Sequence, residues 1–124
     1  MGNPKFFHKR VKSFEFAVQG IATFFRTQTN AWIHLSAALL AVIMGYICKI
    51  NTTEWCWIVG AITLVFVTEM LNTAIEFLTD LASPSIHPLA KKVKDIAAGA
   101  VLISAIAAVI IAMIIFLPKT ECIL

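Results

Sequence analysis

Glu69, Asn72, Glu76 and Asp80 form the group of side chains in this sequence best able to do chemistry together. They follow an uncharged, mostly apolar run, residues 55–68. At about 100° per residue, a helix places all four in one stripe roughly 80° wide. Carboxylates at membrane depth are costly and normally face a protein interior or a wet cavity. The stripe therefore predicts a functional site, suited either to cation coordination or to proton chemistry.

The composition predicts the environment in which this stripe must work. The chain has 124 residues, of which 60% are hydrophobic and 14% charged, and its mean hydropathy is +0.87. A soluble domain of this size could not hide so much apolar surface. We therefore expect an all-α integral membrane protein with one domain, residues 1–124, and no separate soluble unit.

Residues 5–28 have the pattern of an amphipathic helix. Its apolar side chains recur every three or four residues, at Phe7, Val11, Phe14, Val18, Ile21 and Phe25. With basic residues largely on the other face, this pattern predicts a helix that lies in the lipid headgroup layer. Nucleic acid is not expected as a partner, because anionic lipid accounts equally well for the positive charge.

Three apolar segments are long enough to cross a bilayer: residues 31–48, 55–81 and 89–117. A polar turn, residues 49–54, separates the first two, and the proline-containing segment 82–88 separates the last two. Eight of the ten Lys and Arg residues lie in the N-terminal region or around residues 82–95. This asymmetry predicts a cytoplasmic N-terminus and places the polar stripe near the cytoplasmic surface.

Two further patterns concern association and covalent links. The third span carries Ala100, Ser104, Ala108 and Ala112 at intervals of four, a spacing that favours close helix packing in lipid and predicts a homo-oligomer. Of the three cysteines, Cys48 and Cys56 are expected near the same end of neighbouring helices. A disulfide between them is conceivable, although simply packed thiols are the favoured interpretation.

A second polar cluster follows the proline-containing segment: His87, Lys91, Lys92, Lys94 and Asp95. Carboxylates bind Mg²⁺ together with substrate phosphates, lysine supplies a point charge for phosphates, and a desolvated carboxylate can accept a proton from a hydroxyl. Together the two clusters describe phosphoryl transfer at a membrane surface.

Several of these residues also have structural interpretations. Glu76 or Asp80 could pair with Lys91 or Lys94, and His87 could cap the following helix. Lys91 and Lys92 could anchor the chain at the interface. His34 is interpreted as a packed or interfacial histidine. Glu69 is the hardest to explain structurally, because it is the deepest carboxylate and has no nearby partner in sequence.

The main alternative function is a small oligomeric cation or proton pathway that uses Glu69 and Glu76. A pathway needs polar groups through the whole bilayer, whereas residues 55–67 offer only Thr63, and the third span offers only Ser104 after Asp95. Surface chemistry is therefore favoured. Walker-type and protein-kinase nucleotide motifs are absent, which excludes a soluble-kinase fold.

The chain resembles the small prokaryotic diacylglycerol kinase family, which includes undecaprenol kinases. The resemblance is carried by Glu69-x-x-Asn72-Thr-Ala-Ile-Glu76 through Asp80 and by residues 87–102, HPLAKKVKDIAAGAVL. It implies a multi-pass homotrimer in the bacterial inner membrane with shared active sites, ATP and Mg²⁺ as reactants, and a lipid hydroxyl (undecaprenol or diacylglycerol) as acceptor. The segments around His87 and Gly99 are closer to the undecaprenol kinase branch.

The same resemblance assigns roles to individual residues. It implies that Glu69 is the general base, that Asn72 orients the site and that Glu76 is a metal ligand. The nucleotide site would draw on Lys9, Phe16, Ser85, Ile86, His87, Lys94 and Asp95. The chain departs from the family at Gln28, where a second metal-binding glutamate is usual. An amide oxygen can ligate Mg²⁺ but brings no negative charge, so we expect weaker metal binding.

Overall fold

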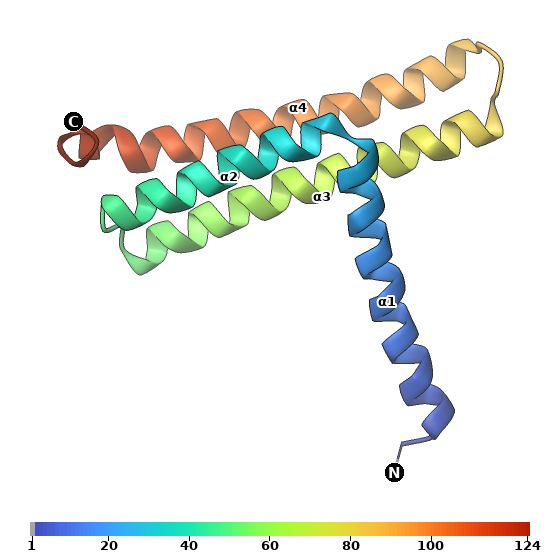
Figure 1. Ribbon diagram of the computed structural model, residues 1–124. Helices are drawn as coiled ribbons and strands as arrows, with labels where there is room; N and C mark the ends of the chain where they lie inside the picture. The colour runs from blue at the N-terminus through green and yellow to red at the C-terminus, as the bar shows by residue number, and fades with distance from the viewer. Residues whose placement is uncertain (1) are drawn as a thin grey trace.

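The computed structural model describes residues 2–124, and within them the regular structure is entirely helical (Figure 1). The elements are α1 (Pro4–Thr27), α2 (Thr29–Ile47), α3 (Thr52–Ala82), α4 (Pro88–Phe116) and the short 3₁₀ segment η1 (Leu117–Cys122). Helices α2, α3 and α4 run side by side, whereas α1 extends away from them (Figure 1). The all-α prediction is confirmed.

Three helical stretches are long and apolar enough to cross a membrane: Thr29–Ile47, Thr52–Ala82 and Pro88–Cys122. Helices long and apolar enough to span a membrane therefore occur at all three predicted positions, with ends that differ by a few residues. The largest difference at a start is at α3, which begins inside the expected polar turn. Asn51 accepts a hydrogen bond from the Glu54 backbone N–H, and the Glu54 carboxylate accepts one from the Asn51 N–H. This reciprocal cap satisfies two backbone donors and starts the helix three residues earlier.

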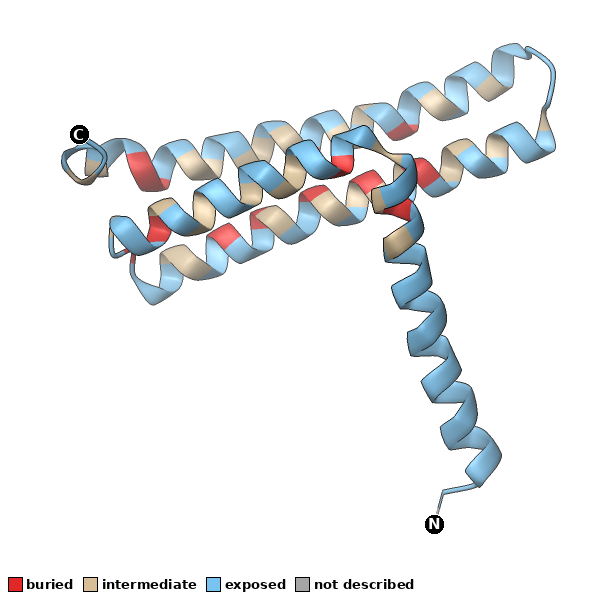
Figure 2. Cartoon of the chain, viewed as in Figure 1, coloured by how far each residue is buried: buried red, intermediate tan, exposed pale blue. Residues whose placement is uncertain are grey.

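Helices α3 and α4 pack along one another over most of their length (Figure 1). The buried positions of α3 recur every three or four residues, at Ile58, Ala61, Val65, Glu69 and Thr73 (Figure 2). On α4, Ala97 and Ser104 are buried. Ser104 belongs to the stripe of small residues, so part of that stripe serves packing within one chain. Glu69 and Thr73 continue the same face as the apolar residues, which explains their burial.

The two ends of the helical bundle are built differently. At the end that holds the α2–α3 turn, a small apolar core unites Ile50, Ile58, Ile115 and Phe116. A disulfide joins Cys48 to Cys122, whose Cα atoms are 5.3 Å apart, and Lys119 pairs with Glu54. We call this the packed end.

The Cys48–Cys56 disulfide is therefore wrong, and so is the favoured interpretation of Cys48 as a packed thiol. After α4, the chain turns back through η1 and brings Cys122 to the C-terminal end of α2. Cys56 remains a free, exposed thiol on α3.

Helix α1 is exposed along almost its whole length, and Phe24 is its one buried residue (Figure 2). Asn3 caps its start by accepting a hydrogen bond from the Lys5 N–H at 3.1 Å. Its last turn packs back on the bundle, where the Phe25 and Phe66 rings lie 6.1 Å apart. The apolar face of the preceding turns is open, as the interfacial prediction requires.

Candidate active site

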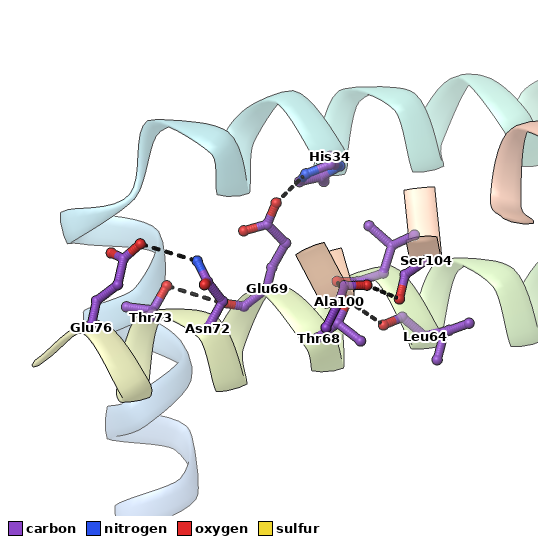
Figure 3. A network of polar contacts seen from close by, with 10 residues as sticks. His34, Leu64, Thr68, Glu69, Asn72, Thr73, Glu76, Ala100 and Ser104 are labelled. Atoms are coloured by element: carbon purple, nitrogen blue, oxygen red, sulfur yellow. Dashed lines mark hydrogen bonds and ion pairs between the residues drawn. The ribbon is translucent and has the colours of Figure 1, made fainter. Parts of the chain in front are cut away.

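Glu69 is the first residue of the polar stripe and is only 5% exposed. Its Oε1 lies 2.7 Å from Nε2 of His34, which reaches it from α2 (Figure 3). Among the described residues, this is the single ion pair or side-chain hydrogen bond of the Glu69 carboxyl. The deepest carboxylate of the chain thus has a partner, but that partner is neither a lysine nor an arginine.

The position of His34 depends on the α1–α2 corner. Gln28 ends α1 and precedes α2, and the Trp32 indole N–H donates to the Phe25 carbonyl at 2.9 Å across that corner. The His34 ring then packs edge-on against Phe66, one turn before Glu69 on α3. The sequence-based interpretation of His34 as a packed histidine missed this contact. The rule that flagged Glu69, an ionisable side chain within a span, applies equally to His34.

Asn72 and Glu76 form the next step of the stripe. The Asn72 amide donates to Glu76 Oε1 at 3.2 Å (Figure 3), and both residues are half-buried. The Asn72 Oδ1 atom is buried and finds no hydrogen-bond partner among residues 2–124. An acceptor oxygen left unpaired in this way is costly, and a cation or a substrate donor would satisfy it.

The loop between α3 and α4 borders a cleft of about 310 Å³ at the Asp80 end of the stripe. Residues that line it include Asp80, Ser85, Ile86, His87, Lys94 and Asp95, so the structure brings most of the predicted nucleotide set together. Lys94 Nζ lies 2.6 Å from Asp80 Oδ1, and Lys91 Nζ lies 2.5 Å from Asp95 Oδ2. The structural interpretation of Asp80 as a partner of Lys94 is confirmed.

His87 has a structural role in this cleft. It is the N-cap of α4, and its Nδ1 accepts a hydrogen bond from the Leu89 backbone N–H at 3.0 Å. The predicted capping role is therefore confirmed. The cap uses Nδ1 and leaves Nε2 uncommitted, and His87 also lines the cleft.

Two predicted nucleotide residues are not gathered with the others within one chain. Lys9 and Phe16 lie on α1, which extends away from the α3–α4 loop (Figure 1), and Phe16 is 64% exposed. Gln28 is half-buried at the α1–α2 corner, where its amide donates to the Thr27 hydroxyl at 3.4 Å.

The donor atoms around Asn72 and Glu76 are compatible with a hard cation. Among residues 2–124, no three His, Cys, Asp or Glu side chains gather closely enough to hold a metal ion. One carboxylate together with the unpaired amide oxygen of Asn72 suits Mg²⁺, which usually binds through one or two carboxylates, waters and substrate phosphates. These residues thus fit a metal that is bound jointly with a phosphate substrate.

The fold and the site together define a class of protein. Three membrane-capable helices hold the buried Glu69 carboxylate. The half-buried Asn72–Glu76 pair follows along α3, and the cleft that Lys91 and Lys94 line lies between the end of α3 and the start of α4. These features are typical of a membrane-embedded phosphotransferase, in which positioned charges stabilise the transferring phosphoryl group.

Comparison with known proteins identifies the family. Residues 15–116 match the family model of prokaryotic diacylglycerol kinase. The chain is 44% identical over 108 residues to the undecaprenol kinase of Bacillus subtilis, a match that covers 87% of this chain and 88% of the relative. It is also 38% identical over 107 residues to a diacylglycerol kinase of Synechocystis, covering 86% and 61%, and 33% identical over 87 residues to that of Escherichia coli, covering 64% and 71%. The chain belongs to the prokaryotic diacylglycerol kinase family and is a lipid kinase.

Proposed function

We propose that this enzyme transfers the γ-phosphate of ATP to the hydroxyl of undecaprenol, with Glu69 as the general base. The observation that carries this proposal is the carboxyl of Glu69, which is buried on a membrane-capable helix and has no lysine or arginine partner in the described part of the chain. Such a group is expensive to maintain in a membrane, and a carboxylate can serve as the general base for a hydroxyl. The greater identity to an undecaprenol kinase favours that lipid over diacylglycerol.

The base acts on the acceptor lipid. A lipid hydroxyl that reaches Glu69 gives its proton to the carboxylate as the lipid oxygen attacks the γ-phosphorus. Because Glu69 lies on the packed face of α3, its rotamer is restricted before substrate arrives. Restricting the reacting groups in this way contributes much of the rate enhancement that positioning can provide.

Glu76 and Gln28 are the proposed ligands of Mg²⁺. Asn72 orients Glu76 through its amide N–H, and its unpaired Oδ1 would be a further oxygen for the metal. When bound, the metal neutralises charge on the phosphates and favours an attack on the γ-phosphorus. Gln28 contributes an oxygen without a negative charge, so most of the electrostatic attraction falls on Glu76.

The cleft of the α3–α4 loop is the proposed nucleotide site. Ser85, Ile86 and His87 line it from the segment before α4, and Lys94 and Asp95 line it from α4. Lys94 supplies the positive charge for the phosphates, which requires that it exchange its contact with Asp80 for one with the nucleotide. Lys9 and Phe16 complete the site from α1.

The proposed arrangement in the membrane follows from the same site. We place the N-terminus and the α3–α4 loop on the cytoplasmic side of a bacterial inner membrane, where ATP is available, and α1 in the headgroup layer. A homotrimer with shared active sites would let α1 of one copy reach the cleft of another. We treat residues 1–124 as one catalytic domain.

The decisive experiment is a phosphorylation assay with purified protein, labelled ATP and Mg²⁺. Undecaprenol and diacylglycerol are offered side by side, and the Glu69→Ala protein serves as the control. We expect transfer to undecaprenol at a higher kcat/KM and almost none by the variant. Transfer to neither lipid, or full activity in Glu69→Ala, would contradict the proposal.

A further inference from the structure

His34 is the side chain through which α2 reaches the reacting end of the site. Its Nε2 lies 2.7 Å from Oε1 of Glu69 (Figure 3), and the two side chains are 23% and 7% exposed, respectively. Both come from elements far apart in the chain, separated by 35 residues. None of the roles assigned so far uses this contact.

The chemistry of the pair determines the direction of its hydrogen bond. A glutamate that serves as a base is ionised and can only accept hydrogen bonds, so the proton between the two groups belongs to Nε2 of His34. The bond engages Oε1. Because no other side-chain bond to Glu69 occurs within residues 2–124, Oε2 remains the open acceptor of the carboxylate.

The imidazole is itself held firmly. Phe66 packs against its ring with the two planes inclined by 72°. The ring also borders an apolar groove of about 270 Å³, which Phe66 lines as well and which consists mainly of alanine, isoleucine and valine residues of α2, α3 and α4. In such water-poor surroundings, a hydrogen bond to a charged acceptor is stronger than it would be in water.

We propose that His34 is a positioning residue of the phosphoryl transfer. Its hydrogen bond to Oε1 fixes the Glu69 carboxylate and thereby directs Oε2 toward the lipid hydroxyl. This inference rests on the proposed function. As the lipid oxygen forms its bond to the γ-phosphorus, the bond from that phosphorus to the ADP oxygen breaks, and the hydroxyl proton passes to Oε2. The Nε2 proton stays on His34, because the carbonyl oxygen of the protonated Glu69 still accepts it.

The geometry provides a matched pair of substitutions. The side-chain amide of glutamine extends about as far as Nε2 of histidine, whereas that of asparagine reaches only the position of Nδ1. We expect His34→Asn and His34→Ala to lower kcat about 10- to 100-fold with KM values for lipid and ATP changed less than about twofold, since positioning errors act on the chemical step. His34→Gln should retain most of the kcat. Equal losses in the Asn and Gln variants, or a raised lipid KM with kcat intact, would overturn the positioning role.

A double substitution tests whether His34 acts through Glu69. In the Glu69→Gln background, His34→Asn should cause no further loss of the residual rate, because residues that act as a unit are not additive. A further tenfold loss would show that His34 acts independently. If the wild-type protein phosphorylates neither lipid, the proposed function fails; if it is active and His34→Asn matches it, the role of His34 alone fails.

A spectroscopic measurement separates the contact from the activity. In protein labelled with ¹⁵N-histidine, the resonances of His34 are assigned by their loss in His34→Gln. We expect a proton on Nε2 and a change in its shift in Glu69→Gln, with the signals of His8 and His87 unmoved. Insensitivity of the His34 signals to Glu69→Gln would overturn the inference whatever the assay shows.

Discussion

The packed end of this protein differs in construction from the part that holds the candidate active site, which we call the site end, although both are built from the same three helices. At the packed end, buried apolar side chains, a disulfide and the Lys119–Glu54 pair close the bundle. At the site end, buried positions of α3 are occupied by Glu69 and Thr73 instead. An unpaired amide oxygen and an open cleft lie beyond them. The contrast indicates that stability is concentrated away from the chemistry, which leaves the site free to hold groups that cost stability.

Substitution of Glu69 by glutamine should give the largest effect and affect only the site end. We expect kcat to fall about 10²- to 10⁴-fold, the range of a lost general base. The temperature of unfolding in detergent should hardly change, because glutamine can still accept from His34. Lipid phosphorylation and thermal unfolding measure the two effects. Glu121→Gln, at an exposed position of the packed end, is the matched control and should change neither.

Removal of the disulfide should give the reverse result. Cys48 and Cys122 are 74 residues apart, so their link restricts the unfolded chain strongly. We expect Cys48→Ser with Cys122→Ser to lower the free energy of unfolding by about 2–4 kcal/mol while kcat is retained. Denaturant titration in detergent measures this. Cys56→Ser should match the wild type, and a kcat that falls with the disulfide would show that the two ends are coupled.

A substitution that creates a cavity in the packed end should lower the free energy of unfolding less than removal of the disulfide does. Ile58 is 2% exposed within the apolar core. Ile58→Ala should destabilise the protein by about 2 kcal/mol, the low end for such substitutions. The reason is that lipid tails are as apolar as the helix interface, so burial between helices contributes less than it does in water. Ile114→Ala, at a position 68% exposed, serves as the control and should cost far less. Equal destabilisation by both would contradict the assigned core.

The smallest effect concerns the metal. Gln28→Glu would place a second carboxylate at the α1–α2 corner and should lower the Mg²⁺ concentration for half-maximal activity several-fold. Stability should be nearly unchanged, because Gln28 is only half-buried. A magnesium titration of the phosphorylation rate tests this. An unchanged or higher requirement would show that Gln28 does not ligate the metal.

Local patterns in the sequence predicted much of the fold and most of the residues that gather at the candidate site. The apolar lengths predicted three spans, the prolines predicted the break between α3 and α4, and the 3.6-residue period aligned the polar stripe. The helical ends were predicted less well, because the Asn51–Glu54 cap depends on side-chain geometry in one turn. Family motifs identified the lipid kinase, because its chemistry requires particular residues at particular spacings along a helix.

The sequence by itself determined which carboxylates lie within a membrane helix and which loop stands beside them. Only the tertiary structure decided their partners. Glu69 has no partner nearby in sequence, yet His34 reaches it from 35 residues away, and Cys48 joins Cys122 rather than Cys56. Both contacts depend on the register between packed helices and on the return of the chain after α4. Helical periodicity specifies the face on which a residue lies, but the packing of one helix against another decides what that face meets.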